Sequence, residues 1–377
     1  MQTKYRADHC GSLLRPAELR NARLDRLRGR ITSEDLASIE DKCILEILAL
    51  QKDVGLKIFS DGEFRRGSWL SAISEDYFDG MQNEGIDFVR YPFLKDKNIE
   101  DADHFVPPNP VVTGKLSRKK RITAHESEFL KKYSPGDFKI TIPSPVMLSR
   151  ASYKVGVSER AYPHWNDFFE DFSRLLAEEV SDIAADGVKY IQLDAPFYTR
   201  FIIPEKIKLL TDQGIDPKEE LERTIAAENR CLRAARKPGV TVAVHICLGT
   251  FILGPQGPLG GAGSYDARLV GSLLERLEAD VFLIEYSERT GALESLKMAP
   301  KDKILCLGIQ NVRDPRIESV DEVVAKIENA ANYVPLDNLT ISPNCGFSGA
   351  AADAFVTPDI QKRKLEVMTE AARKVWA

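Results

Sequence analysis

Short apolar runs with the character of buried β-strands alternate with amphipathic stretches along the chain, and this alternation constrains the fold more than any other feature. Eight such runs occur. They resemble the strands of a parallel sheet that is covered on both faces, because they are nearly continuous in apolar residues. The expected strands are Tyr5–Asp8, Leu56–Ser60, Phe138–Ile142, Val188–Leu193, Val240–His245, Val281–Tyr286, Ile304–Ile309 and Leu339–Ser342.

Helical periodicity fills most of the intervals between these runs. The signals for helix ends are local: Thr32 and Ser33 can cap a helix start, and Gly55 and Gly187 follow the ends of two periodic stretches. The connector after the sixth strand is weaker, with Ala292–Lys297 as its helical piece. The other expected helices are Glu34–Val54, Trp165–Ala185, Lys218–Arg236, Asp266–Glu278, Val320–Asn332 and Asp359–Val375.

Eight strands that alternate with helices predict an α/β fold of the (β/α)8 TIM-barrel class. A chain of 377 residues fits one such barrel, so we expect a single catalytic domain over residues 1–377. The alternative, an open doubly wound sheet, calls for a dinucleotide or P-loop fingerprint after the first strand. No such fingerprint occurs there.

Two segments interrupt the repeat. Residues from about 81 to 136 contain a Pro-Pro pair, charge clusters and two weak strand patterns, Pro110–Val112 and Arg121–Thr123, and are expected to form an insertion after the second strand that caps the barrel mouth. The glycine-rich segment Gly249–Gly263 follows the fifth strand but lacks the Lys-Ser/Thr ending of a phosphate-binding loop. We therefore expect a lid over the site.

Composition excludes several classes of partner. The net charge of −5 gives no positive field that would attract nucleic acid or an anionic membrane. No stretch is apolar enough for a membrane span, and the N-terminal residues lack the apolar core of a signal peptide, so a cytoplasmic protein is expected. Six cysteines in such a chain are better interpreted as thiols or metal ligands than as disulfides.

Polar side chains gather where the expected strands end. In a TIM barrel the active site lies at the C-terminal ends of the strands, so these residues form one set of candidates. The set comprises His9, Ser12, Asp61, Glu63, Ser144, Asp194, His245, Cys247, Glu285, Gln310 and Cys345.

His245 and Cys247 are two residues apart on an extended segment, so their side chains point to the same side and can reach one metal ion. Cys345 follows the eighth strand and can join them where barrel strands converge. One imidazole and two thiolates favour zinc and leave a coordination position open. Glu285 is a carboxylate in an apolar strand and needs a metal or a basic partner. A hydrogen-bonded histidine beside buried free cysteines is the open alternative, and Cys43, Cys231 and Cys306 are expected to be packing residues.

The motifs together resemble the cobalamin-independent methionine synthase family, in particular its catalytic C-terminal barrel and its single-barrel relatives. The likeness covers essentially the whole chain. It rests on RADHCGSLLRP (6–16), SDGEFRR (60–66), IQLDAP (191–196), HIC (245–247), IEYSER (284–289) and PLDNLTISPNCGFSG (335–349). The resemblance implies that zinc is bound by His245, Cys247, Glu285 and Cys345, and that Ser12, Glu63 and Asp194 hold a thiol amino acid.

The sequence departs from the family pattern in two ways. An Asp-Glu-Pro segment of the family reads Asp194-Ala195-Pro196, which loses one carboxylate, and the long N-terminal half of the folate-using enzymes is not present. These departures favour a relative of the epoxyalkane:coenzyme M transferase type, which joins coenzyme M to short epoxides. Methyl transfer to homocysteine is the alternative. A uroporphyrinogen-decarboxylase-like lyase and a non-catalytic zinc protein are remoter ones.

In both transferase interpretations, a metal-bound thiolate attacks an electrophilic carbon. Epoxide opening also needs a proton donor, for which His9, Tyr198 and water are the candidates. A sulfonate would need a guanidinium, for which Arg65, Arg66 and Arg200 lie near strand ends. The expected partners are a small-molecule thiol and an alkyl donor, and the sequence leaves open whether the protein forms a homo-oligomer.

Overall fold

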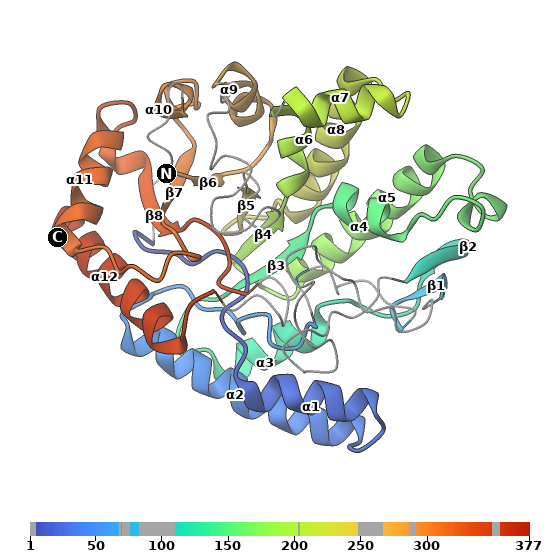
Figure 1. Ribbon diagram of the computed structural model, residues 1–377, viewed down its shortest axis with the longest axis horizontal. Helices are drawn as coiled ribbons and strands as arrows, with labels where there is room; N and C mark the ends of the chain where they lie inside the picture. The colour runs from blue at the N-terminus through green and yellow to red at the C-terminus, as the bar shows by residue number, and fades with distance from the viewer. Residues whose placement is uncertain are drawn as a thin grey trace.

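The central element of the fold is a parallel β-sheet with helices packed outside it (Figure 1). The computed structural model describes residues 5–67, 69, 76–82, 110–202, 204–247, 267–286, 292–348 and 355–377. Six strands pair in chain order, each parallel to the next. They are β3 (Lys139–Pro143), β4 (Tyr190–Asp194), β5 (Thr241–Ile246), β6 (Val281–Glu285), β7 (Ile304–Gln310) and β8 (Leu339–Pro343).

The first two expected strands are shorter than predicted. Each forms a single parallel bridge: Ala7 pairs with Ile341 on β8, and Phe59 pairs with Phe138 next to β3. They thus extend the order of the sheet at its two ends. In the described structure these two segments meet through Leu13 N–H donating to Gly62 O at 3.2 Å and through the side chains of His9 and Ser60, 2.8 Å apart. The prediction of two full strands was wrong because side chains and turns replace the backbone ladder here.

Helices cover the outside of the sheet, and α2 begins at the predicted cap, Thr32. Thr32 and Asp35 form a capping box at the start of α2, and Ser319 and Glu322 form another at α11. The helices that the sequence predicted are α2 (Ser33–Asp53), α5 (Trp165–Ala185), α8 (Pro217–Ala235), α9 (Ala267–Arg276), α10 (Ala292–Leu296), α11 (Val320–Ala331) and α12 (Pro358–Trp376).

Further helices were not predicted. They are α1 (Ala17–Leu27), α3 (Ala124–Tyr133), α4 (Pro145–Ser152), α6 (Thr199–Ile202) and α7 (Pro204–Asp212). The α4 helix begins with a proline directly after β3, where the missing N–H of Pro145 costs no hydrogen bond. The loops after β3 and β4 are therefore partly helical, which brings more side chains to the sheet's C-terminal edge than extended loops would.

The expected insertion contains a β-hairpin. Strand β1 (Phe78–Gln82) pairs antiparallel with β2 (Val111–Arg118), which is longer than the predicted Pro110–Val112. Gly80 is required there, because its φ is +78° and a Cβ atom would lie 2.5 Å from Lys115 O. The strand predicted at Arg121–Thr123 was wrong, since α3 begins at once afterwards. Residues 83–109 and the Gly249–Gly263 segment, predicted to cap and close the mouth, lie outside the described residues.

Apolar side chains form two separate clusters. The larger one fills the layer between the sheet and the helices and includes the fully buried Cys231 and Cys43, as predicted for packing cysteines. The smaller one lies inside the ring of strands. It consists of Cys10, Ile58, Tyr190, Ala243, Leu283 and Cys306. None of the helices in the described ranges is both long and apolar enough to cross a membrane.

One acidic residue of the helix layer is buried without an ion-pair partner among the described residues. Glu228 on α8 has no exposed surface, and neither carboxyl oxygen accepts a hydrogen bond of good geometry from those residues. Burial raises the pKa of the Glu228 carboxyl from 4.5 to about 8; the nearby Ser144 hydroxyl opposes this rise, and the charge of Asp194 adds to it. The native protein therefore holds this carboxyl in its protonated form at neutral pH.

Glu228 should make the protein less stable as the pH rises. The unfolded chain releases this proton near pH 4.5 and the native state near pH 8, so the contribution to the free energy of unfolding is full below pH 4.5 and is lost towards pH 8. We expect Glu228→Gln to be more stable than the wild type at pH 8 by at least about 1 kcal/mol, roughly one pKa unit. The difference should be small at pH 5. Urea unfolding at both pH values measures it, and an equal difference at both would contradict the assignment.

Candidate active site

The candidate site lies at the C-terminal ends of the strands, where alternation of side chains sets which residues face inward. Side chains two residues apart on a strand share a face. Asp194 at the end of β4 is in register with His245 on β5, and Glu285 at the end of β6 is in register with Gly308 on β7. Since His245 is in register with Leu283 on β6, Glu285 lies two residues further along, and the polar groups of β4, β5 and β6 gather at the C-terminal edge of the sheet.

Three of the predicted metal ligands lie together. The donor atoms of His245, Cys247 and Cys345 are all within 4.8 Å of one another. The two sulfur atoms are 4.0 Å apart, and the Cys247 thiol donates to Glu285 Oε1 at 3.4 Å. His245 and Cys247 are buried, whereas Cys345 and Glu285 are partly exposed. The predicted juxtaposition of these three side chains is correct.

The His245 ring is oriented by a carboxylate. Its Nδ1 atom lies 3.1 Å from Asp194 Oδ1, whereas its Nε2 atom is buried and has no hydrogen-bond partner among the described residues. A buried ring nitrogen without a partner is costly unless a ligand occupies it. A histidine that donates one N–H to a carboxylate and keeps the other nitrogen free has the arrangement typical of metal-binding imidazoles.

The loop of Cys345 is held on both sides by backbone contacts. Asn344 N–H donates to Gln310 O at 2.9 Å, and Asn344 Oδ1 accepts from Val312 N–H at 3.1 Å. On the other side Gly346 packs on the Ser12 turn, and Phe347 N–H donates to Ser12 O at 2.8 Å. A Cβ atom on Gly346 would lie 2.7 Å from Ser12 N. The glycine thus allows the close approach that places Cys345 beside β5.

A second group of buried side chains surrounds Glu63. Its Oε1 atom accepts from Thr141 Oγ1 at 2.8 Å, and the other carboxyl oxygen accepts from the Ser12 hydroxyl. Glu63 has a φ of +59° and is the single non-glycine residue in the described ranges with a left-handed backbone. The buried Arg15 donates to Glu63 O at 3.2 Å and to Arg66 O at 3.1 Å, which holds this turn. Strained residues of this kind gather at functional sites.

Asp61 adds a further carboxyl group below this turn. Its Oδ1 atom accepts from Glu63 N–H at 2.9 Å, and its Oδ2 atom is buried without a partner among the described residues. Burial and the charge of Glu126 raise the pKa of Asp61 to about 6. Ser12, Glu63 and Asp61 thus bring two buried carboxyl groups together, and Arg66 Nη1 lies 3.9 Å from Glu63 Oε1.

The arginines proposed to bind a sulfonate are placed differently from what was expected. Arg65 contacts Asp41 at 2.5 Å and Glu40 at 3.5 Å on α2. Arg66 makes a bidentate pair with Glu126, at 2.8 and 2.6 Å. Both guanidinium groups are neutralised by carboxylates of the chain, so neither offers the expected clamp.

Arg200 is half-buried and stacks on Phe197 at 4.7 Å, and in the described part of the chain it contacts no carboxylate. Burial, together with the charge of Arg150, lowers the pKa of Arg200. Of the three candidates, it alone forms no ion pair within the described residues, although the charge of Glu220 acts on it. Arg200 lies in the short helix α6, which follows β4.

The two proposed proton donors are not suited to that role. His9 is buried, its Nε2 atom lies 2.8 Å from Ser60 Oγ, and burial together with the charge of Lys139 lowers its pKa to about 3. The imidazole is therefore neutral. Tyr198 belongs to the apolar layer between sheet and helices, and burial raises its pKa well above the ordinary value. Tyr198 lies in the short helical turn after β4, and its ring packs in the apolar layer between the sheet and the helices.

Sequence reasoning missed a group of polar residues below the site. Lys139 on β3, Gln192 on β4 and Asp8 are buried inside the ring of strands. Burial alone would raise the pKa of Asp8, but the Lys139 ammonium at 2.8 Å holds it below its ordinary value. The signal was available: Lys139 and Thr141 interrupt an apolar strand at alternate positions, which indicates a polar inner face.

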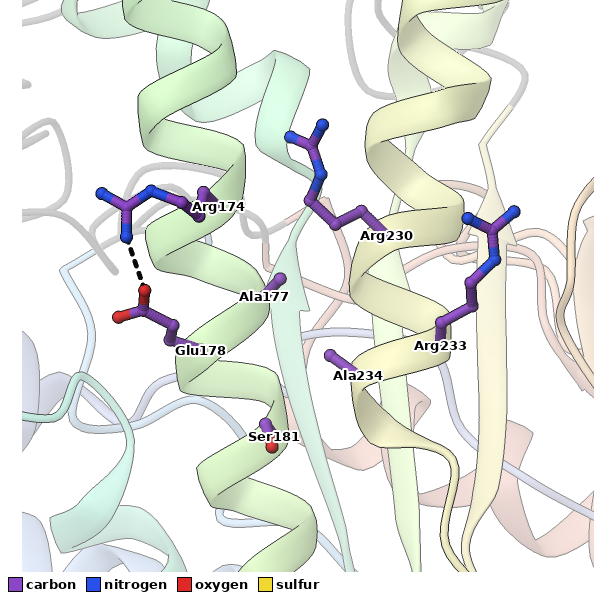
Figure 2. A pocket seen from close by; sticks show the side chains of 7 residues that line it. All are labelled: Arg174, Ala177, Glu178, Ser181, Arg230, Arg233 and Ala234. Carbon is purple, nitrogen blue, oxygen red and sulfur yellow. Dashed lines mark hydrogen bonds and ion pairs between the residues drawn. The ribbon is translucent and has the colours of Figure 1, made fainter.

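A groove of about 510 Å³ lies elsewhere, between α5 and α8 on the outer surface (Figure 2). Its arginines are paired with acids: Arg174 with Glu178 at 2.6 Å, Arg230 with Glu170 at 2.7 Å and Arg233 with Glu278 at 2.6 Å. No charge is left over there for a ligand. The groove is lined by Arg174, Ala177, Glu178, Ser181, Arg230, Arg233 and Ala234.

Gly346→Ala should weaken metal binding because the added methyl group would force the Cys345 loop away from Ser12. We expect zinc affinity to fall about tenfold, equivalent to roughly 1.4 kcal/mol, measured by competition with a chelator. Gly156→Ala is the matched control: this glycine has a φ of +84° with nothing within 4 Å of its Cβ position, so the change strains the backbone far from the site. Equal affinities of the two variants would show that the close approach does not position Cys345.

Comparison with known proteins agrees with the geometry. The family model described as the catalytic domain of cobalamin-independent synthase matches residues 7–374. The uncharacterized protein YxjG of Bacillus subtilis is 31% identical over 379 residues, which cover 99% of this chain and 95% of that protein. The 5-methyltetrahydropteroyltriglutamate–homocysteine methyltransferase of Lactococcus lactis is 25% identical over 97% of this chain but over only 42% of that enzyme.

Two solved structures share the fold. A putative vitamin-B12 independent methionine synthase from Listeria monocytogenes gives a TM-score of 0.74 at 24% identity and covers 100% of this chain and 99% of its own. A B12-independent methionine synthase from a Shewanella species, solved in complex with selenomethionine, gives 0.72 at 20% identity, with 98% and 97% covered. The α/β barrel architecture predicted from the strand count is thereby confirmed.

These findings give no support to the expectation of coenzyme M and epoxides, and favour the methionine-forming alternative. Among the relatives with a named activity, the Lactococcus protein carries the name of a homocysteine methyltransferase and the Shewanella protein that of a methionine synthase. The two departures of sequence that had suggested an epoxide do not outweigh a match along nearly the entire chain. The chain belongs to the cobalamin-independent synthase catalytic-domain family, a family of alkyl- and methyltransferase enzymes.

Proposed function

We propose that this protein is a zinc-dependent methyltransferase that methylates the thiol of homocysteine or a closely similar amino acid. The observation that carries the proposal is the cluster of His245, Cys247 and Cys345, whose donor atoms lie within 4.8 Å of one another. The family names of the matched relatives support the same chemistry.

The donor set suits zinc. One imidazole nitrogen and two sulfurs are the ligands that zinc prefers over magnesium or calcium, and three protein ligands leave a position for a substrate. The unpartnered Nε2 atom of His245 fits this assignment. Glu285 lies beside Cys247 and is the candidate for a fourth ligand. A zinc ion bound here would lower the pKa of a coordinated thiol, so that the thiolate forms at neutral pH.

The chain's own residues hold the rest of the amino acid. Glu63 and Asp194 are buried carboxylates near the mouth, and they would bind an α-ammonium group. Ser12 orients Glu63 through its hydroxyl. Gln310 adds a buried side-chain amide with no hydrogen-bond partner among the described residues, which suits a polar substrate group.

The reaction is a displacement at a methyl carbon. The sulfur of the amino acid forms a bond to that carbon, the bond between the carbon and the donor's leaving atom breaks, and the leaving atom takes up a proton. Burial of Cys247 and His245 keeps water from competing for the methyl group. Since the chain spans less than half of the Lactococcus methyltransferase, the methyl donor is best identified by experiment.

A panel of thiols and donors tests the proposed function. Homocysteine should be methylated by at least one of a set of N-methyl and S-methyl donors, with the product identified by mass. Coenzyme M and epoxypropane provide the competing pair. Faster alkylation of coenzyme M than of homocysteine would overturn the proposal in favour of the epoxide reaction.

Removal of one cysteine ligand should remove the metal. Cys247→Ala or Cys345→Ala should lose most bound zinc and nearly all activity, while Glu285→Gln should weaken zinc binding less than either. Cys231→Ala is the matched control, because Cys231 is fully buried in the packing core on α8. Metal analysis after dialysis gives zinc per chain. Turnover by a metal-free Cys247→Ala protein would contradict the zinc mechanism.

Glu63→Gln should act on the ammonium group alone. We expect kcat/KM for homocysteine to fall roughly ten- to hundredfold, the worth of a charged hydrogen bond of about 1.5–3 kcal/mol. 4-Mercaptobutanoate is homocysteine without its amine, so its slower turnover should change little in the same variant. Parallel losses for both thiols would mean that Glu63 maintains the site rather than binding the ammonium.

A further inference from the structure

Below His245, a chain of hydrogen bonds crosses the interior of the sheet. His245 Nδ1 lies 3.1 Å from Asp194 Oδ1, and the same oxygen accepts from Gln192 Nε2 at 2.8 Å. Gln192 Oε1 in turn accepts from Lys139 Nζ at 2.8 Å. These hydrogen bonds thus connect β3 through β4 to β5, three neighbouring strands in Figure 1.

The far end of this chain is a buried ion pair. Lys139 Nζ lies 2.8 Å from Asp8 Oδ1 and also donates to His9 O, and Tyr190 OH donates to Asp8 Oδ2 at 2.9 Å. Lys139 is 1% exposed and Gln192 is fully buried. Water therefore has little access to these groups, and each needs a hydrogen-bond partner from the protein itself.

The donors and acceptors can be arranged in only one direction. An ammonium group donates and cannot accept, so Gln192 must turn its oxygen towards Lys139. Its NH₂ group then faces Asp194, which must accept. Asp194 accepts from His245 Nδ1 as well, so the proton of the neutral imidazole sits on Nδ1 and the lone pair on Nε2. Nε2 is the ring nitrogen that has no partner within the described parts of the chain.

The geometry points to Lys139 and Gln192 as positioning residues that fix the tautomer of His245 and so prepare its Nε2 atom for a metal ion. Gln192 acts on His245 through Asp194, and Lys139 acts through Gln192. This inference rests on the metal-binding role of His245 in the proposed function, but it does not depend on which substrate is methylated. It assigns a role to two residues two and three steps behind the ligand.

The tautomer of His245 can be measured without any metal. In metal-free protein with ¹⁵N-labelled histidine, the two ring nitrogens give separate resonances according to which carries the proton. The chain has five histidines, and the His245→Gln variant assigns the signals of His245. We expect the Nδ1-protonated form in the wild type. A wild-type ring protonated on Nε2 would overturn the inference.

Two substitutions of Gln192 distinguish the direction of its hydrogen bonds from the packing of its side chain. Gln192→Met removes both hydrogen bonds, while Gln192→Glu keeps an acceptor for Lys139 but loses the donor towards Asp194. Both should increase the Nε2-protonated form of His245 and lower zinc affinity about 10- to 100-fold in a chelator competition. If both variants keep the wild-type tautomer and bind zinc within about twofold of the wild-type affinity, the inferred relay, the series of hydrogen bonds from Lys139 to His245, is wrong.

The ion pair is tested by removing both of its charges. The double variant Lys139→Met with Asp8→Asn avoids leaving a lone buried charge and should shift the tautomer in the same direction. Gln361→Met is the matched control: Gln361 is 1% exposed, accepts one hydrogen bond from Leu14 N–H on the helix side and should change neither readout. If this control shifted the tautomer or the zinc affinity as much as Gln192→Met does, the effect would be explained by a general loss of packing. That result would overturn the relay.

The absorption spectrum of cobalt(II) bound in place of zinc adds a readout of ligand geometry. The Gln192 variants should change its visible bands, whereas the Gln361 control should keep the wild-type spectrum. Failure of all methyl-transfer assays with intact tautomer and zinc effects would refute the proposed function and leave the relay standing. Normal methyl transfer with an unchanged tautomer in both Gln192 variants would refute the relay and leave the proposed function standing.

Discussion

Parallel pairing of strands in chain order is the constraint on which the rest of the molecule depends. Because every strand from β3 to β8 runs in the same direction, all their C-terminal ends lie at one edge. Cys247 and Cys345 meet there, although β6, β7 and β8 and their helices separate them along the chain. The twofold alternation of side chains then decides which residues face inward: His245, Cys247 and Glu285 occupy inward positions, and their neighbours pack against helices.

The interior of the sheet is unusual in that its polar groups are satisfied by one another. A lysine buried among strands is costly, and the cost is offset by the carboxylate of Asp8 and the amide of Gln192. From Gln192 the hydrogen bonds continue through Asp194 to His245. Packing alone would favour an apolar side chain at each of these positions, so the network is better explained by what it does for the site above it.

The site contrasts with the rest of the molecule in its unsatisfied atoms. In the described ranges, His245 Nε2, Asp61 Oδ2 and the Gln310 amide are buried without hydrogen-bond partners. Elsewhere at the mouth the charges are paired: Arg66 is held by Glu126, and Arg65 by residues of α2. This distribution favours a ligand that brings a cationic group and a soft donor, as an amino acid with a thiol does, over one that brings a sulfonate.

The sequence by itself determined the order of strands and helices, and with it the edge of the sheet at which the candidate metal ligands meet. The spacing of His245 and Cys247 sufficed because two residues on a strand share a face, and Cys345 followed from its place after the last strand. Tertiary structure decided the partners of charged groups, since a sequence does not say which acid reaches Arg66 or how Tyr198 turns into the core. It also decided the contacts of Gly346 and the relay from Lys139, because both depend on atoms of segments that are distant in the chain and are brought within 3 Å only by packing.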